Sequence, residues 1–549
     1  MKKYIAIIFI FIFCLLVGCT QPLKTYTITY DLDGGVCDGL VESYQEGEIV
    51  ILPKAAKEGY TFLGWFVEDI KVEIIEEGNY SLVAKWEKYE MPTDKVTFNI
   101  YSLNDFHGSI FEDGYNAGFS KIGNYLRELD TNTSIILSAG DMFQGTAVSS
   151  MSRGAVVVDV MNYIGFDAMT IGNHEFDWGD SEIIKFVDDD KSNGEANFPL
   201  LAANIIDKRT GELVTWAKPY TVLEKCGVRI GVIGIIGEDQ EGDILASYVK
   251  NYSFEDELTA IKKYTKILRT EEACDIVIVS CHSDTENING SLAALSDEYT
   301  IDAILNGHTH QAYYGELGRE TRANLPYVQS GCYGRYIGLI TIEYSIKEKK
   351  VLDASASYLS ALDVCKSESL QINQILSQYQ EYIDIANQKL GLSGVKLTKD
   401  KGGVWAATAL CDAYDCEVGV VNTGGIRSNG FPINIGDEIT YGDIFEIMPF
   451  ENMVRMVELK GSVIIDELIK FTNSYYLSKN VDRDKLTING ETIDRDKYYK
   501  VVTIDYLFEQ ESKPFLKGKN RVDTTDIFRD VLAQNVRDNV EKNGKFIWG

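Results

Sequence analysis

The sequence predicts an α/β protein, in which helices cover β-sheets, preceded by a small and mostly β N-terminal module. Two observations predict this fold class. From about Lys95 onward, apolar β-type runs alternate with stretches of helical periodicity. Before that point short alternating strands dominate, as where Tyr26, Ile28 and Tyr30 precede the turn at 33–35. The length of 549 residues fits about three or four folded units at roughly 150 residues each.

The composition is that of a globular protein with a strong negative charge. Hydrophobic residues make up 45% and charged residues 25%, which argues against long disorder. Lys+Arg is 53 against Asp+Glu 83, so the net charge is −30. This charge disfavours a nucleic-acid polymer or an anionic membrane surface as a partner. A phosphate-bearing substrate would need a strong local positive charge to dock.

The first residues have the pattern of an export signal. Met1-Lys2-Lys3 is followed by an apolar run too short to span a bilayer comfortably, and then by Leu16-Val17-Gly18-Cys19, which is typical of a bacterial lipoprotein cleavage site. We expect residues 1–19 to be a lipoprotein signal peptide and Cys19 to be lipidated, so that the protein is exported and lipid-anchored on the outer face of a bacterial cell membrane. A plain signal peptide with an incidental cysteine is the alternative. The other cysteines form no CxxC zinc pattern, and spacing assigns no disulfides.

Residues 25–88 form the N-terminal module. The strings "YTITYDLDGG", "GYTFLGWF" and "YSLVAKWE" resemble the Listeria–Bacteroides repeat of surface proteins. The resemblance implies a compact β module, either an adhesion module in contact with cell-surface components or, as we favour, a spacer. A linker follows over 88–95.

Residues 95–361 are expected to form the first α/β domain. Its strands are predicted at 96–103, 134–139, 168–171, 229–235, 275–280 and 303–305, and its helices around Phe119–Leu129 and Leu258–Leu268. A linker helix over 367–390, with Ile372, Ile375, Tyr379 and Ile383 on one face, leads to a second α/β domain at 391–549. There we expect helices at 404–414 and 462–472, and strands at 418–421 and 454–459.

All five histidines of the chain fall at strand ends or in the loops just after them. They come with carboxylates and an amide in five short motifs: Asp105-x-His107, Gly140-Asp141, Gly172-Asn173-His174-Glu175, His282 alone and Gly307-His308-x-His310. The carboxyl ends of strands are where α/β proteins place ligands. Imidazole, carboxylate and amide ligands without thiolate suit Mn, Zn, Fe or Co, and six or seven of them are enough for two divalent ions. Two such ions can activate a water and stabilise phosphoryl displacement, and they supply the positive charge that the chain lacks.

These motifs, in the strings "LNDFHG", "GDMFQGT", "GNHEFDWG" and "NGHTH", resemble the calcineurin-like metallophosphoesterases, and specifically their secreted 5′-nucleotidase branch. The resemblance implies a four-layer β-sandwich flanked by helices, followed by a C-terminal substrate-binding domain. It implies one metal on Asp105, His107 and His310, the other on Asn173, His282 and His308, and Asp141 bridging them. Many nucleotidases of this branch carry Gln at the position of His310. His174 would stabilise the transition state or protonate the leaving oxygen, oriented by Asp177.

The second domain carries the nucleotide motifs of the same family. Asn422-Thr423-Gly424-Gly425-Ile426-Arg427 resembles the N-x-G-G-x-R substrate loop, and Pro449-Phe450-Glu451-Asn452 resembles the "PF-G-N" segment. The resemblance implies that Asn422, Gly424, Gly425 and Arg427 bind substrate and that Phe450 and Tyr506 stack on its base. Two departures stand out. The usual Gly-Gly-Asp-Gly stretch after Tyr506 is absent, with Glu509 and Glu511 as possible substitutes, and an expected arginine is missing near Lys399, Lys401 and Trp405.

The expected activity is a dimetal 5′-nucleotidase acting on extracellular nucleotides for salvage. Two alternatives stay open. One keeps the same chemistry but acts on 2′,3′-cyclic nucleotides with 3′-nucleotides, on nucleotide sugars or on simple phosphomonoesters, and the altered stretch after Tyr506 supports it. A surface adhesion protein with a vestigial enzyme domain is the third reading, and the complete set of ligand residues speaks against it.

Overall fold

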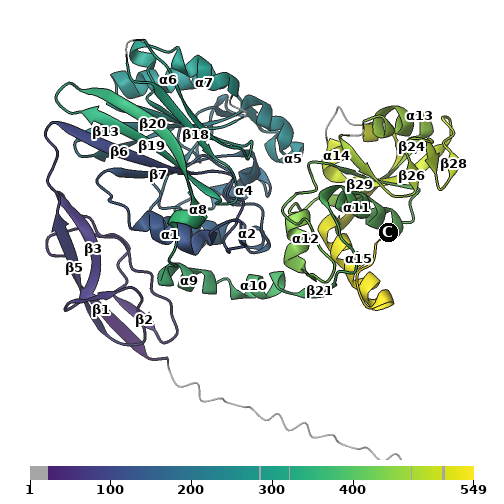
Figure 1. Cartoon of the computed structure of the whole chain (residues 1–549), viewed down its shortest axis with the longest axis horizontal. Coiled ribbons are helices and arrows are strands. Elements are labelled where there is room, and N and C mark those ends of the chain that lie inside the picture. Colours follow the sequence, from purple (N-terminus) through teal and green to yellow (C-terminus); the bar gives the residue numbers. More distant parts are fainter. Residues whose placement is uncertain (1–22, 284–285, 321, 472, 510–513, 549) are drawn as a thin grey trace, which may run out of the picture. The chain divides into compact units, whose positions relative to one another are not determined.

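Two six-stranded sheets pack face to face in the region that carries the histidine motifs (Figure 1). The structure is a computed structural model, and it describes residues 23–283, 286–320, 322–471, 473–509 and 514–548. The first sheet has the order β20 (Lys350–Ser360), β19 (Tyr336–Ser345), β6 (Lys95–Leu103), β7 (Ser134–Ser138), β8 (Ala168–Thr170) and β9 (Leu200–Leu201). The second has the order β12 (Tyr220–Lys225), β13 (Val228–Ile236), β15 (Ile276–His282), β16 (Ala303–Gly307), β18 (Leu325–Ser330) and β17 (Ala312–Leu317).

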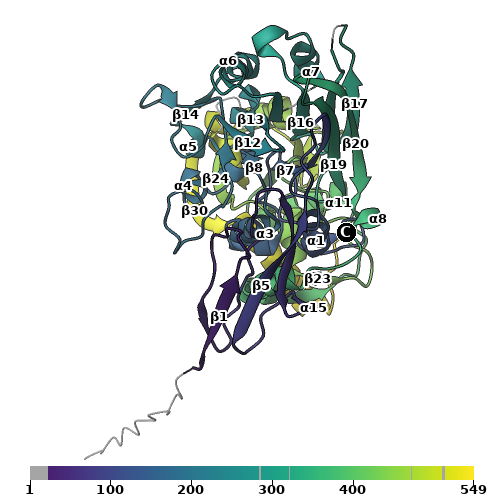
Figure 2. The same cartoon turned by 90° about the vertical axis from the view of Figure 1, so that its left-hand side faces the viewer.

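The facing surfaces of the two sheets form one hydrophobic core. Ile100 and Ile135 of the first sheet and Ile278 and Leu305 of the second belong to the same cluster of buried side chains. At one edge β17 and β20 lie side by side (Figure 2), and the ring centroids of Tyr314 and Tyr358 are 5.3 Å apart. β-branched and leucine side chains fit this doubly covered position, which explains why the strands were readable from their apolar runs.

Helices cover the outer faces of both sheets, giving the four layers that the sequence predicts. On the second sheet α6 (Glu257–Thr270) lies over β13 and β15, with Ile261 and Leu268 in a shared core that Leu292 of α7 (Glu286–Ala293) also joins. On the first sheet α1 (Gly118–Arg127) contacts β6 through the rings of Tyr101 and Tyr125, and α3 (Ala155–Ile164) packs beside it. The strands β6–β9 run parallel, as do β13, β15, β16 and β18, so their carboxyl ends gather at one edge.

Two short helices stand where the sequence predicts one long linker helix. α9 (Leu370–Ser377) begins at Ser369, whose hydroxyl accepts the Ile372 N–H, and α10 (Gln380–Ala386) follows after a break. Tyr379 lies at the break, outside helical backbone geometry, and its hydroxyl donates to Asp159 at 2.5 Å. This long-range contact competes with helix continuation and leaves no trace in the helical periodicity. The chain then enters β21 (Lys389–Leu392).

The second α/β region is built on a five-stranded sheet. Its order is β25 (Tyr475–Leu477), β22 (Val418–Asn422), β29 (Tyr498–Ile504), β24 (Met453–Lys460) and β30 (Lys519–Ile527). Around it lie α11 (Lys399–Ala413), α12 (Tyr441–Ile447), α14 (Asp505–Glu509) and α15 (Phe528–Asn543), and one core joins Trp405, Val420 and Leu532. The helix predicted at 462–472 begins with α13 (Gly461–Val463) and continues as a π-helix over Ile464–Ile469.

The helix α11 begins earlier than the sequence predicts because two glycines conceal its first turns. A Cβ on Gly402 would lie 2.1 Å from the Phe431 ring, and a Cβ on Gly403 would lie 2.2 Å from the Tyr476 ring. Glycine has a low helix propensity, but at these two positions its missing side chain lets two aromatic rings approach the helix backbone. Shorter elements fill the connections: α2 (Ala147–Met151), α4 (Asp180–Ile184), α5 (Ala246–Val249), α8 (Ala361–Val364), β10 (Ile205–Asp207), β11 (Glu212–Leu213), β14 (Tyr252–Phe254), β23 (Glu438–Thr440), β26 (Val481–Asp482), β27 (Thr487–Ile488) and β28 (Glu491–Thr492).

The N-terminal module is a separate unit that ends at Lys88, whereas Tyr89–Gly549 form the other. Its sheet has the order β2 (Ser43–Gln45), β1 (Thr25–Asp31), β5 (Tyr80–Lys88), β3 (Tyr60–Val67) and β4 (Ile70–Val72). Trp65 is buried at its centre, and its indole N–H donates to the Pro53 carbonyl at 2.8 Å. The small mostly β module predicted from the sequence is therefore present.

The predicted signal peptide and Cys19 lie outside the described residues. None of the helices in the described ranges combines the length and apolar character needed to cross a membrane.

Candidate active site

The predicted metal motifs meet at the edge where the parallel strands end. The motifs of Asp105, Asp141 and Asn173 follow β6, β7 and β8, while His282 ends β15 and His308 follows β16. Five of the predicted ligands have left-handed backbones: Asp105 at φ 48°, His107 at 50°, Asp141 at 55°, His308 at 83° and His310 at 61°. Residues other than glycine reach this region at a cost, and such strain clusters at functional sites.

Asp105, His107 and His310 form the first group of candidate ligands. One potential ligand atom from each lies within 4.8 Å of the other two, and both Asp105 and His107 are buried. The His107 Nδ1–H donates to the Gln144 carbonyl at 2.8 Å, which leaves a lone pair on Nε2. That lone pair faces the His310 Nε2 at 3.0 Å. A backbone carbonyl that fixes the tautomer in this way is typical of metal-binding histidines.

Asp141, His282 and His308 form the second group, with Asn173 beside them. The His282 Nδ1–H donates to the Ala139 carbonyl at 2.7 Å, so Nε2 carries the lone pair when the ring is neutral. The Asn173 Oδ1 lies 3.1 Å from that Nε2 and 3.2 Å from the His308 Nδ1, and the Asp141 Oδ2 lies 3.1 Å from the same Nε2. The ring nitrogens of His282 and His308 and the side-chain oxygens of Asn173 and Asp141 therefore converge on one small region. In the neutral rings these atoms are electron-pair donors, which is the arrangement that a metal ion binds.

This donor set fits divalent cations. The Asp141 Oδ2 is fully buried and has no hydrogen-bond donor among the described residues. Burial raises the pKa of Asp105 to about 7, with the Asp141 carboxylate adding to the rise, and burial lowers the pKa of His107. Both shifts express the cost of enclosing these groups without a counter-charge. A cation at each group would relieve that cost.

Glu175 is a functional residue to which the sequence analysis assigned no role. Its carboxylate is buried and accepts the backbone N–H groups of Gly172 at 2.7 Å, Met142 at 2.8 Å and Asp141 at 2.9 Å. It therefore ties the loop after β7 to the loop after β8. Its place in the Gly-Asn-His-Glu motif was the available signal.

His174 stands beside the two groups and is held from both sides. Its Nδ1 lies 2.8 Å from the Asp177 Oδ2, as the sequence predicts for an orienting partner. On the other side Arg427 Nη2 donates to the His174 Nε2 at 2.8 Å. The Phe450 ring stacks on the imidazole with centroids 5.8 Å apart. Burial lowers the pKa of His174, but the carboxylates of Asp177 and Asp141 outweigh it, so the net shift is upward.

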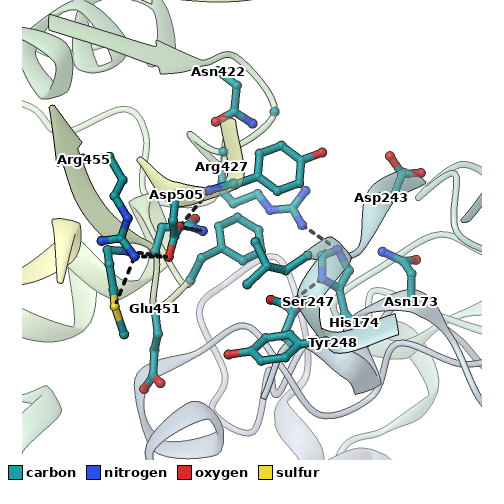
Figure 3. A pocket seen from close by; sticks show the side chains of 18 of the residues that line it. Asn173, His174, Asp243, Ser247, Tyr248, Asn422, Arg427, Glu451, Arg455 and Asp505 are labelled. Carbon is teal, nitrogen blue, oxygen red and sulfur yellow. Dashed lines mark hydrogen bonds and ion pairs between the residues drawn. The ribbon is translucent and has the colours of Figure 1, made fainter. Parts of the chain in front are cut away.

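A cavity of about 470 Å³ opens beside these groups (Figure 3). Asn173, His174, Asp243 and Tyr248 line it from the first α/β region, and Asn422, Arg427, Glu451, Arg455 and Asp505 from the second. All six predicted substrate-binding residues border it: Asn422, Gly424, Gly425, Arg427, Phe450 and Tyr506. The volume suits a small-molecule ligand.

The sequence analysis did not assign a role in this cavity to three of its residues. Asp505 orders the wall beside Tyr506, because it accepts hydrogen bonds from the Asn452 amide at 2.9 Å and the Met453 N–H at 3.0 Å. Arg455 lines the same wall. Glu451, where the family motif has glycine, forms a two-point ion pair with Arg153, with N···O distances of 2.9 and 3.1 Å. The hydrogen bonds of Asp505 and the ion pair of Glu451 join segments that are far apart in sequence, so no local sequence pattern predicts them.

The two departures from the family pattern have different outcomes. Lys399, the first residue of α11, is partly buried, and burial together with the charge of Arg427 lowers its pKa. A cation thus lies near Arg427 where the family arginine is missing. Glu511 and the side chain of Glu509 lie outside the described residues.

Family comparisons agree with this architecture. The model for calcineurin-like phosphoesterase matches residues 98–312, the 5′-nucleotidase C-terminal domain matches 384–517, and the Listeria-Bacteroides repeat domain matches 26–85. The endonuclease YhcR of Bacillus subtilis is 30% identical over 67% of this chain, but the match covers 32% of YhcR. The 5′-nucleotidase of Vibrio cholerae is 28% identical over 70% of this chain and 76% of its own length.

Two further comparisons concern the surface and the fold. The cell wall protein Lmo0130 of Listeria monocytogenes is 27% identical over 76% of this chain and 63% of its own length. The crystal structure of a 5′-nucleotidase precursor from Thermus thermophilus superposes with a TM-score of 0.68 at 20% identity, covering 81% of this chain and 96% of that one. The likeness to the Thermus structure shows the fold.

The four-layer sandwich and its two donor groups define a metal-dependent phosphoester hydrolase. The chain belongs to the metallophosphatase/5′-nucleotidase family, in which a calcineurin-like phosphoesterase domain is joined to a 5′-nucleotidase C-terminal domain.

Proposed function

We propose that the protein hydrolyses 5′-nucleotides to nucleosides and phosphate in nucleotide salvage outside the cell. One observation carries this proposal. A single cavity is lined both by Asn173 and His308 of the metal motifs and by the aromatic side chains of Phe450 and Tyr506 in the C-terminal domain. A phosphate at the metals and a base at the aromatics would then occupy adjoining parts of one site.

Two divalent ions, drawn from Mn, Zn, Fe or Co, would supply an activated water and neutralise charge on the phosphate. Asp105, His107 and His310 would hold one ion, and Asn173, His282 and His308 the other, with Asp141 between them. The separation into two donor groups supports this assignment, although the structure groups Asp141 with His282 and His308.

The chain's own residues would bind the phosphate and the leaving oxygen. Arg427 presents a guanidinium fork to the phosphate, and His174 lies next to it. Because Arg427 now donates to the His174 Nε2, that nitrogen becomes available only when the guanidinium turns to the phosphate. Asp177 keeps the ring oriented meanwhile, through Nδ1. His174 would then stabilise the phosphoryl group or protonate the leaving O5′.

The base-stacking role of Phe450 and Tyr506 predicts a loss confined to nucleotides. Replacing either residue with alanine is expected to lower kcat/KM for AMP by roughly 5- to 150-fold, because base–aromatic stacking contributes about 1–3 kcal/mol. Hydrolysis of p-nitrophenyl phosphate by the same variants serves as the matched control and is expected to stay within about twofold, since no base is involved. Equal losses on both substrates would contradict the stacking role.

The activity itself is tested with a substrate panel. With the metal-reloaded protein, phosphate release is measured from AMP, UMP, 3′-AMP and p-nitrophenyl phosphate. Cleavage of 2′,3′-cyclic AMP, UDP-glucose and a DNA oligonucleotide is followed by chromatography of the products, because the first hydrolysis of each of these releases no free phosphate. The expected result is fast release from the 5′-mononucleotides. A preference for cyclic or sugar-linked substrates would move the assignment to the alternative that the altered segment after Tyr506 suggests.

We further propose that the enzyme is exported and held on the outer cell surface by a lipid on Cys19. The Leu-Val-Gly-Cys motif supports the lipid, and the repeat module together with the cell wall relative supports the surface location. The module would then act as a spacer. The variant Cys19→Ser is expected to lose labelling by radioactive fatty acid and to shift from the membrane fraction to the medium. Unchanged membrane association of this variant would argue against the lipid anchor.

A further inference from the structure

Unlike His107 and His282, His310 lacks a backbone carbonyl that orients its ring. In His107 and His282 the Nδ1–H donates to a carbonyl, at 2.8 and 2.7 Å. A metal-binding histidine almost always has such a partner on its second nitrogen, because the partner fixes both the tautomer and the direction of the ring. The His310 Nε2 faces the His107 Nε2 at 3.0 Å, but the His310 Nδ1 has no hydrogen-bond partner in the described part of the chain.

The backbone on both sides of His310 is nevertheless fixed. Gln329, a buried residue of β18, donates from its amide nitrogen to the Thr309 hydroxyl at 2.6 Å and to the Gln311 carbonyl at 2.7 Å. These two hydrogen bonds hold the main chain of His310 beside its group of candidate ligands. They leave the side chain free to rotate about its two χ angles. A further contact is therefore needed to set the direction of the imidazole lone pair.

The ring of Tyr333 supplies this contact. Its centroid lies 5.6 Å from that of His310 with the ring planes at 81°, and 5.5 Å from that of His107 with the planes at 44°. The two imidazole centroids are 4.9 Å apart, so the three rings pack as a triangle. A separation of about 4.5–7 Å with an edge-to-face orientation is one that aromatic pairs prefer. Tyr333 therefore restricts the rotation of both imidazoles, and His310 depends on it more.

The loop after β18 holds Tyr333 in an unusual backbone conformation. Tyr333 has a φ of 58°, and a bulky side chain reaches this left-handed region only at a cost. Its N–H donates to the Asp105 carbonyl at 2.8 Å, and the Asn104 side-chain amide donates to the Gly331 carbonyl at 2.7 Å. Both hydrogen bonds fasten the loop to the motif that carries Asp105, the third member of the same group. Strain maintained by surrounding contacts clusters at functional sites.

We propose that Tyr333 is a positioning residue of the metal centre, whose ring takes the place of the missing hydrogen bond on His310. The proposal rests on the assignment of one ion to Asp105, His107 and His310 in the proposed function. Tyr333 acts through the position of its ring and not through its hydroxyl, which distinguishes this role from binding a metal or a phosphate. Loss of the ring should weaken the binding of that ion and leave the other ion unaffected.

The affinity for Mn²⁺, measured for one ion at a time, tests this proposal. His282→Ala leaves only the group with His310 intact, and His310→Ala leaves only the group with His282. Free Mn²⁺ is followed by its electron paramagnetic resonance signal. Adding Tyr333→Gly to His282→Ala is expected to weaken Mn²⁺ binding by about 10- to 100-fold, the effect typical of losing an orienting partner. Adding it to His310→Ala should leave the affinity unchanged. Glycine is chosen because it adopts positive φ without strain.

Three further variants separate the ring from other effects. Tyr333→Phe keeps the ring without the hydroxyl, so it should keep the parent affinity. Tyr333→Leu fills the space without a flat ring, and it provides a second test with the same expected direction if the glycine variant does not fold. Tyr336→Ala is the matched control. Its ring belongs to the start of β19 and packs on Tyr358, with centroids 4.7 Å apart, so its loss should leave both affinities intact.

Each result decides the role of Tyr333. Unchanged Mn²⁺ affinity after Tyr333→Gly in the His282→Ala background would overturn the positioning role. An equal loss in Tyr333→Phe, or equal weakening in both backgrounds, would also overturn it. Absence of bound Mn²⁺ from folded His282→Ala that retains Tyr333 would instead refute the separate ion at His310, and the proposed dimetal site would fail before Tyr333 is changed.

Discussion

The variant Asp141→Asn is expected to lose at least about a thousandfold in turnover of AMP, together with metal. Asp141 is fully buried, its Oδ2 faces the His282 Nε2 at 3.1 Å, and its Oδ1 accepts the His174 N–H at 2.9 Å. Asparagine keeps the shape and one carbonyl oxygen but removes the negative charge that would face both ions. Phosphate release and metal content per chain, measured on the same sample, check this expectation.

Asp167→Asn is the matched control for this prediction. Asp167 directly precedes β8, and away from the donor groups its carboxylate accepts the Ile136 N–H at 2.8 Å and forms an ion pair with Lys225 at 3.4 Å. Asparagine can keep that hydrogen bond, so turnover and metal content should stay close to those of the parent protein. Full metal content and activity in Asp141→Asn would remove Asp141 from the metal centre.

The variant His174→Ala is expected to lose about 10²–10⁴-fold in kcat for AMP while it keeps both metals. The ring lies beside the donor groups, between Asp177 and Arg427, and contributes no atom to either group. Asp177→Asn should give a smaller loss, because the imidazole stays in place with a weaker orienting partner. Single-turnover phosphate release and metal analysis separate a chemical defect from metal loss.

The leaving group distinguishes the two roles open to His174. p-Nitrophenolate departs without protonation, so a general acid would matter less for p-nitrophenyl phosphate than for AMP. A residue that stabilises the phosphoryl group would matter equally for both substrates. An unchanged kcat for AMP in His174→Ala would exclude both roles.

The sequence was most informative where candidate metal ligands come directly after a β-strand. Each metal motif stood next to an apolar run such as 134–139 or 275–280, so the position of its ligands at one sheet edge followed from the topology of parallel strands. Glycines and histidines in fixed order then pointed to the family. The left-handed backbones at Asp105 and His310 could not be read in this way, because nothing in residue identity marks them.

What the sequence could not predict depends on contacts between distant segments. The linker breaks at Tyr379 because its hydroxyl reaches Asp159, 220 residues away. Glu451 and Arg153 pair across 298 residues, and Glu175 gathers N–H groups from two loops.

A metal titration tests the central claim most directly. The protein is stripped of metal and reloaded with Mn²⁺ in steps, and both bound metal and phosphate release from AMP are measured at each step. If both groups of candidate ligands bind a metal ion that catalysis needs, phosphate release reaches its maximum at two ions per chain and is absent in the stripped protein. Full release from the stripped protein, or a maximum already reached at one ion per chain, would contradict the dimetal site.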